Sequence, residues 1–430
     1  MKKEESQLME KIVALCKRRG FIFPGSEIYG GLANSFDYGP LGVELKNNIK
    51  SLWWKMFVHQ RDDMVGIDAA LIMNPKVWEA SGHLKEFSDP LVECKKCHHR
   101  FRADKIEGKI CSDCGGVLTE AKQFNLMLKT FLGPAEEKAN EVYFRPETAQ
   151  AMFVDFKNVL DSTRIKIPFG ISQIGKAFRN EITPGNFIFR TREFEQMEIE
   201  YFIEEKNWKD SFEMWRNQML SWMTNVLGLK KENIHELDVP KNELAHYSKK
   251  TIDFEYDFPF GKDELYGLAY RTDFDLKNHY KEAPYADTET GEKFYPHVIE
   301  PTFGVDRSVL AVLSDAYVEE QDRAVLKLKP VLAPYKAAVF PLVKNKPELV
   351  EKAREIYDEL RKDFSVTFDD RGNIGKRYYS QDEIGTPYCI TVDYDSLEND
   401  DVTVRDRDTM KQERIKIKDL HSFINEKINT

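Results

Sequence analysis

The chain has 430 residues, of which 41% are hydrophobic and 32% are charged, and its formal net charge is −10. This composition is typical of a soluble globular protein with two or three domains and a large core. The negative net charge argues against a protein that coats nucleic acid nonspecifically, although a local basic groove remains compatible with it. The apolar runs are too short to cross a bilayer, and the N-terminal segment lacks an apolar signal core. We therefore expect a cytoplasmic protein with no membrane contact.

Two helices are predicted in the N-terminal part of the chain. Residues 6–19 show helical spacing of apolar side chains, and Gly20 is placed to end that helix. Pro40 stands where a second helix can begin, and residues 41–60 continue it. The apolar stripe of this second helix consists of Leu41, Leu45, Ile49, Leu52 and Met56. Taken alone, the stripe favours a helix that is buried in the protein core.

Four of the six cysteines form two CxxC pairs, and 13 residues (98–110) separate the pairs. Four thiolates at this spacing can surround one tetrahedral Zn²⁺, and Gly115 and Gly116 let the backbone turn after the second pair. The alternative is a set of reduced thiols without a metal. His98 and His99 are expected to be bystanders, because the cysteines already fill the coordination shell. The predicted zinc ligands are Cys94, Cys97, Cys111 and Cys114.

Residues 178–202 predict two antiparallel strands joined by a turn at residues 183–186. Arg179 and Glu181 share a face of the first strand, and the side chains of the second strand alternate between two faces. One face carries Arg190, Arg192, Phe194, Gln196, Glu198 and Glu200, and the other carries Phe189, Thr191, Glu193, Glu195, Met197, Ile199 and Tyr201. So many charges of both signs suggest the wall of a polar cleft, with a solvated, salt-bridged face as the alternative.

An extended segment at residues 300–304 is followed by a predicted helix that begins at Gly304. The free N–H groups and the positive end of the dipole at a helix start favour an anion, and Arg307 lies in the first turn. The alternative is an ordinary arginine at a helix start. A further helix at residues 207–228 carries an aromatic stripe that is typical of core packing.

A separate unit begins near residue 331, where strands and helices start to alternate. This alternation predicts a mixed sheet covered by helices. The predicted strands are 336–342, 366–369, 388–392, 402–406 and 413–417, and the predicted helices are 347–362, 375–383 and 420–427.

Four segments carry a family resemblance when they are taken together. They are RPETAQ at residues 145–150, FRNE at 178–181, RTREFEQME at 190–198 and EPTFGVDR at 300–307. In sequence and in order along the chain, these segments resemble the dimeric glycyl-tRNA synthetases, a family of class II aminoacyl-tRNA synthetases. FRNE and RTREFEQME look like motif 2 of that class, and EPTFGVDR looks like motif 3. The resemblance extends over nearly the whole chain.

The resemblance implies an α+β fold, with an antiparallel catalytic sheet flanked by helices and a C-terminal α/β anticodon-binding domain. It places the class II catalytic domain at residues 1–330, with a zinc-ribbon-like insertion at 93–117, and the anticodon-binding domain at 331–430. Residues 21–60 would form motif 1, the dimer interface, so a homodimer is expected. The zinc is expected to be structural, because some members of the family lack these cysteines.

For ATP, the resemblance assigns the α-phosphate to Arg179, the adenine amino group to Glu181 and stacking on the adenine ring to Phe194. Arg307 would reach the γ-phosphate, and Glu264 would hold Mg²⁺ as a hard oxygen ligand. Arg179, Arg307 and Glu264 are therefore the expected catalytic residues. The expected ATP site comprises Arg179, Asn180, Glu181, Phe189, Arg190, Thr191, Arg192, Glu193, Phe194, Glu264, Leu265, Gly304, Val305, Asp306 and Arg307.

For glycine, the resemblance assigns the α-ammonium group to Glu147 and Glu198. Thr302 stands where the family has serine, so the hydroxyl is kept and an added methyl narrows the pocket. Arg102 matches a substrate-contacting arginine. The expected substrate-binding residues are Arg102, Glu147, Phe194, Glu195, Gln196, Met197, Glu198, Glu300, Pro301, Thr302, Phe303 and Gly304.

In the C-terminal domain, the resemblance makes several residues candidates to contact tRNA. Lys376, Arg377, Arg405 and Arg407 would meet phosphates or bases, and Tyr378 and Tyr379 would stack on unpaired bases.

The implied activity is glycine–tRNA ligation with ATP, Mg²⁺, glycine and tRNA(Gly). One alternative is a noncatalytic relative that uses the fold as a nucleic-acid clamp, but such a relative should have lost the phosphate-binding arginines, and Arg179 and Arg307 are present. A second alternative is a synthetase for another amino acid, against which the RPETAQ and EPTFG segments argue.

Overall fold

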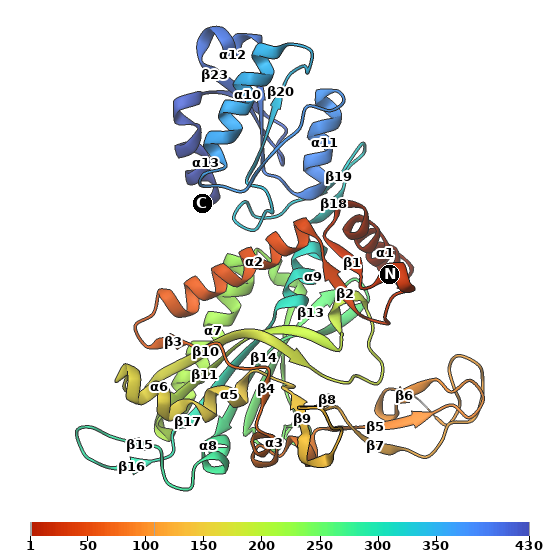
Figure 1. Cartoon of the computed structure of the whole chain (residues 1–430), viewed down its shortest axis with the longest axis vertical. Helices are drawn as coiled ribbons and strands as arrows, with labels where there is room; N and C mark the ends of the chain where they lie inside the picture. The colour runs from red at the N-terminus through yellow and green to blue at the C-terminus, as the bar shows by residue number, and fades with distance from the viewer. Residues whose placement is uncertain (1, 107, 430) are drawn as a thin grey trace.

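The computed structural model describes residues 2–106 and 108–429, and two sheets dominate it (Figure 1). The larger sheet has seven strands in the order β12-β13-β14-β17-β11-β10-β3. All neighbouring strands are antiparallel except β10 and β3. The strands are β3 (Met64–Gly66), β10 (Phe169–Phe178), β11 (Glu193–Ile203), β12 (Ile234–Asp238), β13 (Lys250–Phe258), β14 (Gly261–Thr272) and β17 (His297–Gly304). This is the antiparallel sheet that the sequence predicts.

Four helices share an apolar core with one face of this sheet. They are α1 (Lys2–Arg19), α2 (Pro40–Trp54, continued to His59 as a π-helix), α7 (Trp208–Ser221, continued to Val226 as a π-helix) and α9 (Val305–Ala316). Met197 and Phe303 reach this core from β11 and β17. Leu41, Leu45 and Ile49 of the predicted stripe on α2 are buried there too, so the stripe packs within its own chain.

The opposite face of the sheet is only partly covered. The short helices α5 (Ala149–Val154), α6 (Phe156–Thr163) and α8 (Phe274–His279) form a second core with Phe169, Ile171 and Phe202. Phe202 is at the far end of β11, on the face that also carries Phe194 and Glu198. The near end of that face remains open for a ligand.

Small sheets and helices surround the large sheet. One three-stranded sheet joins β4 (Ile72–Met73), β9 (Glu141–Phe144) and β8 (Lys129–Phe131), next to α3 (Pro75–Ala80) and α4 (His83–Glu86). Another joins β6 (Arg100–Arg102), β5 (Ser88–Glu93) and β7 (Lys122–Asn125), and it projects to one side of the body (Figure 1). The two-stranded pairs are β1 (Ile22–Pro24) with β2 (Phe36–Tyr38), β15 (Tyr285–Ala286) with β16 (Lys293–Phe294), and β18 (Tyr317–Glu319) with β19 (Ala324–Leu326).

The C-terminal unit lies beyond α1 and α2, at the top of Figure 1. Its sheet has the order β21-β20-β22-β23-β24, with parallel pairing among the first three strands and antiparallel pairing beyond. The strands are β20 (Ala337–Pro341), β21 (Val366–Phe368), β22 (Tyr388–Val392), β23 (Asp401–Asp406) and β24 (Gln412–Lys416), and the helices are α10 (Pro347–Leu360), α11 (Ile374–Ile384), α12 (Tyr394–Asn399) and α13 (Leu420–Asn429). The mixed sheet is as predicted, and only α12 is additional; Asp393 and Ser396 form its capping box.

The loop of the central hairpin is longer than predicted. β10 ends at Phe178 and β11 begins at Glu193, so Arg179, Glu181 and the residues up to Arg192 form a loop rather than strand ends. Tertiary packing explains the difference, because Ile188 and Phe189 turn into the core and Phe189 contacts the rings of Phe258 and Phe260. The predicted turn region lies inside this loop, where Gly185 pairs with Arg190.

Three arginines that were predicted to contact tRNA are buried instead. Arg405 binds Asp382 through two nitrogens at 2.8 and 3.0 Å. Arg377 donates hydrogen bonds to the carbonyls of Pro341 and Leu342, and Arg407 donates to the carbonyls of Leu328 and Gly385. These interactions hold the C-terminal unit together, so the prediction for Arg377, Arg405 and Arg407 is wrong. Lys376 and Tyr379 are exposed, whereas Tyr378 is half-buried and bonded to Thr391 at 2.7 Å.

Asp382 is the anion of this cluster, and it also binds Arg323 from the segment that links the two units. Its side chain is fully buried. Asp382→Ala leaves two buried guanidinium groups without their shared partner, so we expect the free energy of unfolding to fall by about 3–5 kcal/mol. Urea unfolding of the whole chain measures this loss, and Glu398→Ala, at an exposed position on α12, is the control. A loss no greater than that of the control would contradict the proposed role of Asp382.

Candidate active site

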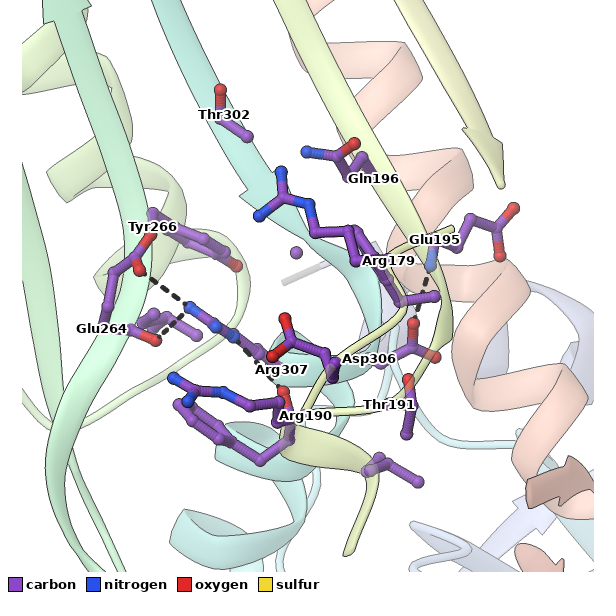
Figure 2. A pocket seen from close by; sticks show the side chains of 16 residues that line it. Arg179, Arg190, Thr191, Glu195, Gln196, Glu264, Tyr266, Thr302, Asp306 and Arg307 are labelled. Carbon is purple, nitrogen blue, oxygen red and sulfur yellow. Dashed lines mark hydrogen bonds and ion pairs between the residues drawn. The ribbon is translucent and has the colours of Figure 1, made fainter. Parts of the chain in front are cut away.

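A solvent-open cleft, with about 690 Å³ of empty space, lies on the uncovered end of the polar face. Strands β11, β14 and β17, the start of α9 and the loop between β10 and β11 form its walls (Figure 2). Its lining residues are Arg179, Glu181, Ile188, Phe189, Arg190, Thr191, Phe194, Glu195, Gln196, Glu264, Leu265, Tyr266, Thr302, Gly304, Asp306 and Arg307. Segments far apart in the sequence thus meet in one cleft, as the motif pattern predicts.

Arg179 enters the cleft from the residue after β10 (Figure 2). Its Nε donates a hydrogen bond to the carbonyl of Pro146 at 3.0 Å, and its guanidinium lies 5.3 Å from the ring centre of Phe194. Among the described residues, neither Arg179 nor Arg190 forms an ion pair. Two guanidinium groups without carboxylate partners favour an anionic ligand in this cleft.

Arg307 and Glu264 meet on the other wall of the cleft. Arg307 Nη1 donates to the carbonyl oxygen of Glu264 at 2.7 Å and lies 3.2 Å from its carboxylate (Figure 2). The guanidinium also lies 4.4 Å from the ring centre of Phe189. Burial alone would raise the pKa of the Glu264 carboxyl, but Arg307 outweighs it and lowers that pKa. Glu264 is therefore an ionised oxygen ligand at neutral pH and fits a hard cation such as Mg²⁺.

Several predicted site residues point to the helix-covered side instead. The side chain of Glu195 pairs with Lys46 at 2.9 Å and Lys50 at 3.2 Å, both on α2. Asp306 accepts hydrogen bonds from the hydroxyl of Tyr38 at 2.6 Å and from the backbone N–H of Glu195 at 2.8 Å. The side chains of Met197, Phe303 and Val305 are buried in the main core. The side chains of Met197, Phe303 and Val305 are therefore corrected to supporting roles. Glu195 still borders the cleft, although its carboxylate is paired with the lysines of α2.

Other predicted residues lie beside the cleft without lining it. The backbone N–H of Asn180 donates to the carbonyl of Leu126 at 2.8 Å, and Arg192 donates to the carbonyl of Glu181 at 3.2 Å. Glu193 pairs with Lys176 at 2.8 Å on the surface. These contacts shape the loop between β10 and β11, and contact of these three residues with ATP stays a prediction.

A second group of predicted residues forms an acidic pocket next to the cleft. Thr302 Oγ1 donates to Glu198 Oε1 at 2.9 Å, and the backbone N–H of Thr148 donates to Glu198 Oε2 at 3.1 Å. Glu147 accepts from Gln150 at 2.9 Å and lies 3.4 Å from His83. Both carboxylates are buried, and they are held by groups from β17, α5 and the segment before α5.

The two glutamates of this pocket have different electrostatic surroundings. Burial would raise the pKa of the Glu147 carboxyl, but His83 and Arg271 hold it well below its ordinary value. Burial and the nearby charge of Glu147 raise the pKa of Glu198. Glu300 lies beside them and accepts a hydrogen bond from Arg271 at 2.6 Å. The pocket therefore contains more carboxylates than guanidinium groups and favours a small cation.

Comparison with known proteins agrees with this geometry. The family profile described as tRNA synthetase class II core domain (G, H, P, S and T) matches residues 131–316, and the profile described as anticodon binding domain matches residues 336–427. The glycine–tRNA ligase of Alkaliphilus oremlandii is 54% identical over 458 residues, which cover 98% of both chains. That of Acetivibrio thermocellus is 53% identical over 464 residues, covering 99% of this chain and 100% of the relative.

The chain belongs to the glycine–tRNA ligase family. Among solved structures, the prolyl-tRNA synthetase of Cryptosporidium parvum in complex with halofuginone and AMPPNP has a TM-score of 0.69 at 17% identity, and the match covers 97% of this chain and 75% of the other. That likeness supports the fold alone. Together, the comparisons confirm the class II fold with its C-terminal anticodon-binding domain and the ligase activity predicted from the sequence. A class II core implies the use of ATP and Mg²⁺. No helix in the described part of the chain has the length and hydropathy needed to span a membrane.

The structure of this ligase adds residues that the motifs do not contain. Arg271 binds Asp275 at 2.8 and 2.9 Å and Glu300 at 2.6 Å, and all three side chains are buried. Tyr266 and Ile188 complete the wall of the cleft. In the sequence, Arg271 and Asp275 are four residues apart at the end of β14, which is a weak signal for a buried ion pair.

The four predicted zinc ligands come together at the tip of the β5–β6–β7 sheet. Their sulfur atoms all lie within 4.8 Å of one another, with 3.5 Å between Cys94 and Cys114 and 3.7 Å between Cys97 and Cys111. A tetrahedral zinc with Zn–S bonds of about 2.3 Å needs sulfur atoms about 3.8 Å apart, so the cluster fits this metal. Gly116 is required here, because a Cβ atom would lie 2.8 Å from the sulfur of Cys94.

The histidines next to the cysteines have other partners. His98 binds Glu93 at 3.1 Å, and His99 binds Asp113 at 2.6 Å. Both contacts agree with the expectation that these histidines are bystanders.

Arg102 lies on the same small sheet but not in the cleft. Its guanidinium pairs with Asp89 at 2.8 Å and Asp104 at 2.9 Å, and the residue lines a separate hollow beside the cysteines. The two aspartates bind the guanidinium in this arrangement, and the substrate contact of Arg102 stays a prediction.

We predict that elemental analysis of the purified ligase finds about one zinc per chain, as four thiolates in tetrahedral array require. Cys97→Ser should lose the metal, whereas Cys389→Ser, at a buried cysteine of the C-terminal unit, should keep it. A folded wild-type protein that contains no metal would refute the zinc site.

Proposed function

We propose that this ligase activates glycine in the cleft between Arg179 and Arg307 and then transfers it to tRNA(Gly). In the first step, the glycine carboxylate attacks the α-phosphorus of ATP, the bond to the β-phosphate oxygen breaks, and glycyl-adenylate and pyrophosphate are formed. In the second step, the 3′-terminal adenosine hydroxyl of the tRNA attacks the activated carbonyl and AMP leaves. This proposal depends on one observation: a cleft with two arginines that lack carboxylate partners among the described residues adjoins a buried acidic cluster on one face of β11.

Each wall of the cleft has a distinct task in this proposal. Arg179 holds the α-phosphate, where its planar fork can donate two hydrogen bonds, and Phe194 stacks on the adenine ring. Glu181 accepts from the adenine amino group, which is supported by its buried Oε2 without a hydrogen-bond partner among the described residues. Arg307 binds the γ-phosphate. Glu264 would hold Mg²⁺, which supplies positive charge to neutralise the phosphates.

No protein nucleophile is needed, because the glycine carboxylate itself attacks. The protein therefore acts by holding the reactants in line and by stabilising the charge that develops on the α-phosphate. Arg179 is fixed for this purpose by the carbonyl of Pro146 and by the rings on either side of it. A preorganised donor does not need to reorganise during the reaction.

The acidic pocket selects the amino acid. Glu147 and Glu198 receive the α-ammonium group of glycine, with Gln196 and Glu300 beside them. Thr302 limits the space for a side chain, and its hydrogen bond to Glu198 fixes the orientation of the threonine methyl. Glycine has no side chain that the protein could bind, so selectivity must come from steric exclusion of larger amino acids.

The proposed assembly follows the expected domain limits: residues 1–330 for catalysis, 93–117 for a structural zinc insertion and 331–430 for the anticodon. The exposed residues Lys376 and Tyr379 are the proposed tRNA contacts that the structure leaves available. A cytoplasmic homodimer through residues 21–60 is proposed as well. Its support is the loop before α2, where Ile28 and Tyr29 are 88% and 86% exposed.

Arg179→Ala tests the phosphate-binding role. We expect ATP–pyrophosphate exchange with glycine to fall by about 10²–10³-fold, as when one oxyanion donor is lost, while the thermal midpoint is retained. Exchange requires no tRNA, so Arg371→Ala, an exposed arginine of the C-terminal unit, is the matched control. Full exchange activity of Arg179→Ala would rule out the assignment.

Thr302→Gly tests selection by size. Across the twenty amino acids, the wild type should support exchange with glycine alone. Thr302→Gly opens room for a methyl group, so we expect discrimination against alanine to drop by about 10–200-fold. Thr302→Ser keeps the hydrogen bond to Glu198 and serves as control. If the ratio of kcat/KM for glycine to that for alanine stays the same in Thr302→Gly, Thr302 does not exclude larger amino acids by size.

A further inference from the structure

Glu200 is a buried acid that the reaction described above does not use. It lies on β11 two residues after Glu198 and therefore on the same face of the sheet. Its side chain is fully buried, and neither carboxyl oxygen has a hydrogen-bond partner among the described residues. An ionised carboxylate that is buried without a hydrogen-bond partner greatly destabilises the folded state, so the protonation state of Glu200 needs an explanation.

The strand register places a second acid directly opposite. β11 pairs with β17 such that Gln196 faces Gly304 and Tyr201 faces Ile299. The same register brings Glu200 opposite Glu300. Carboxyl oxygens of Glu198, Glu200 and Glu300 all lie within 4.8 Å of one another. Like charges at directly opposed positions destabilise a sheet, so both acids of this pair cannot be ionised without a compensating cation.

Among the described residues, no cation forms an ion pair with Glu200. The charged groups that face it are Glu198 on its own strand, Glu300 on β17, Arg271 on β14 and Asp275 on α8. Arg271 is the one cation among these groups, and it pairs with Asp275, Glu300 and, at 4.0 Å, Glu147. Helix α5 packs against β11, and its sequence AQAMFV contains no ionisable residue. The facing part of β10, residues 170–174, contains none either.

We propose that Glu200 is a neutral carboxylic acid in the folded ligase and that it positions Glu300 for binding the ammonium group of glycine. A protonated Glu200 places an O–H group near the Glu300 carboxylate, within the 4.8 Å that separates their oxygens, where a second negative charge would repel. This inference rests on the proposed glycine pocket. Glu200 is a positioning residue, because it acts through Glu300 and not by touching glycine.

Burial raises the pKa of Glu200 well above its ordinary value, and the charge of Glu300 raises it further. In the unfolded chain, the pKa of the same carboxyl is near its ordinary value of 4.5. Below that pH, Glu200 is protonated in both the folded and the unfolded state, so its titration does not change the stability of the fold. As the pH rises, the unfolded state loses the proton first, so the wild type becomes progressively less stable than a variant with a neutral side chain at this position.

The first test compares thermal midpoints of wild type, Glu200→Gln and the surface control Glu204→Gln from about pH 5 to about pH 8. We expect Glu200→Gln to be at least as stable as the wild type, with an advantage that grows as the pH rises, and Glu204→Gln to show no such trend. An advantage that shrinks with rising pH, or a Glu200→Gln variant that does not fold, would overturn the proposal, since glutamine reproduces the shape of the neutral acid.

The second test uses glycine-dependent pyrophosphate exchange at neutral pH. Glu200→Gln should keep the KM for glycine within about threefold of wild type, whereas Glu198→Gln, which removes a charged acceptor, should raise it about tenfold or more. Glu200→Ala, which removes the donor to Glu300, should also raise this KM, so glutamine rescues what alanine loses. An increase in Glu200→Gln as large as that in Glu198→Gln would mean that Glu200 is ionised and would overturn the proposal.

The two tests separate the two claims. If Glu198→Gln leaves the KM for glycine unchanged, the glycine pocket is misassigned, and the stability comparison still decides whether Glu200 carries a proton. If the pocket is confirmed and the stability advantage of Glu200→Gln is absent, the pocket stands and the neutral acid is refuted.

Discussion

The pairing of β11 with β17 is the constraint on which the rest of the site depends. In this register Glu198 faces Thr302 and Gln196 faces Gly304, so motif 2 and motif 3 meet across one ladder. A shift by one residue would move Glu198 into the helix-covered core and Met197 into the pocket. Met197 and Phe303 are completely buried, and each contributes about 1.5–3 kcal/mol by that burial. The apolar face therefore holds the polar face in register.

The helix-covered side also orients the cleft through charge. Asp306, next to Arg307 in sequence, binds Lys46 and Tyr38 and accepts the backbone N–H of Glu195. Burial would raise the pKa of Asp306, but Lys46 outweighs it, so the carboxylate stays ionised. These bonds fix the first turn of α9 against both α2 and β11. The position of Arg307 in the cleft thus depends on a group that faces away from it.

Much of this arrangement follows from local patterns in the sequence. Period-two alternation predicts both faces of β11, Pro40 predicts the start of α2, and the two CxxC pairs predict the cysteine cluster. The ends of the central strands were not predictable, because burial of Phe189 against distant aromatic rings decides where the loop begins. An arginine that binds RNA and one that binds a buried aspartate look alike in sequence, so Arg405 was misassigned.

The polar face of β11 carries opposite charge at its two ends, and this orders the substrate. Arg179 and Arg190 lie at one end without carboxylate partners, whereas Glu147, Glu198 and Glu300 crowd around the single guanidinium of Arg271 further along. Glycine is a zwitterion, so in the proposed site its ammonium group would lie at the acidic end and its carboxylate toward the arginines. In the reverse orientation, a carboxylate would enter a pocket of carboxylates. In the proposed site, this charge separation would therefore direct the nucleophilic oxygen of glycine toward the phosphate assigned to Arg179.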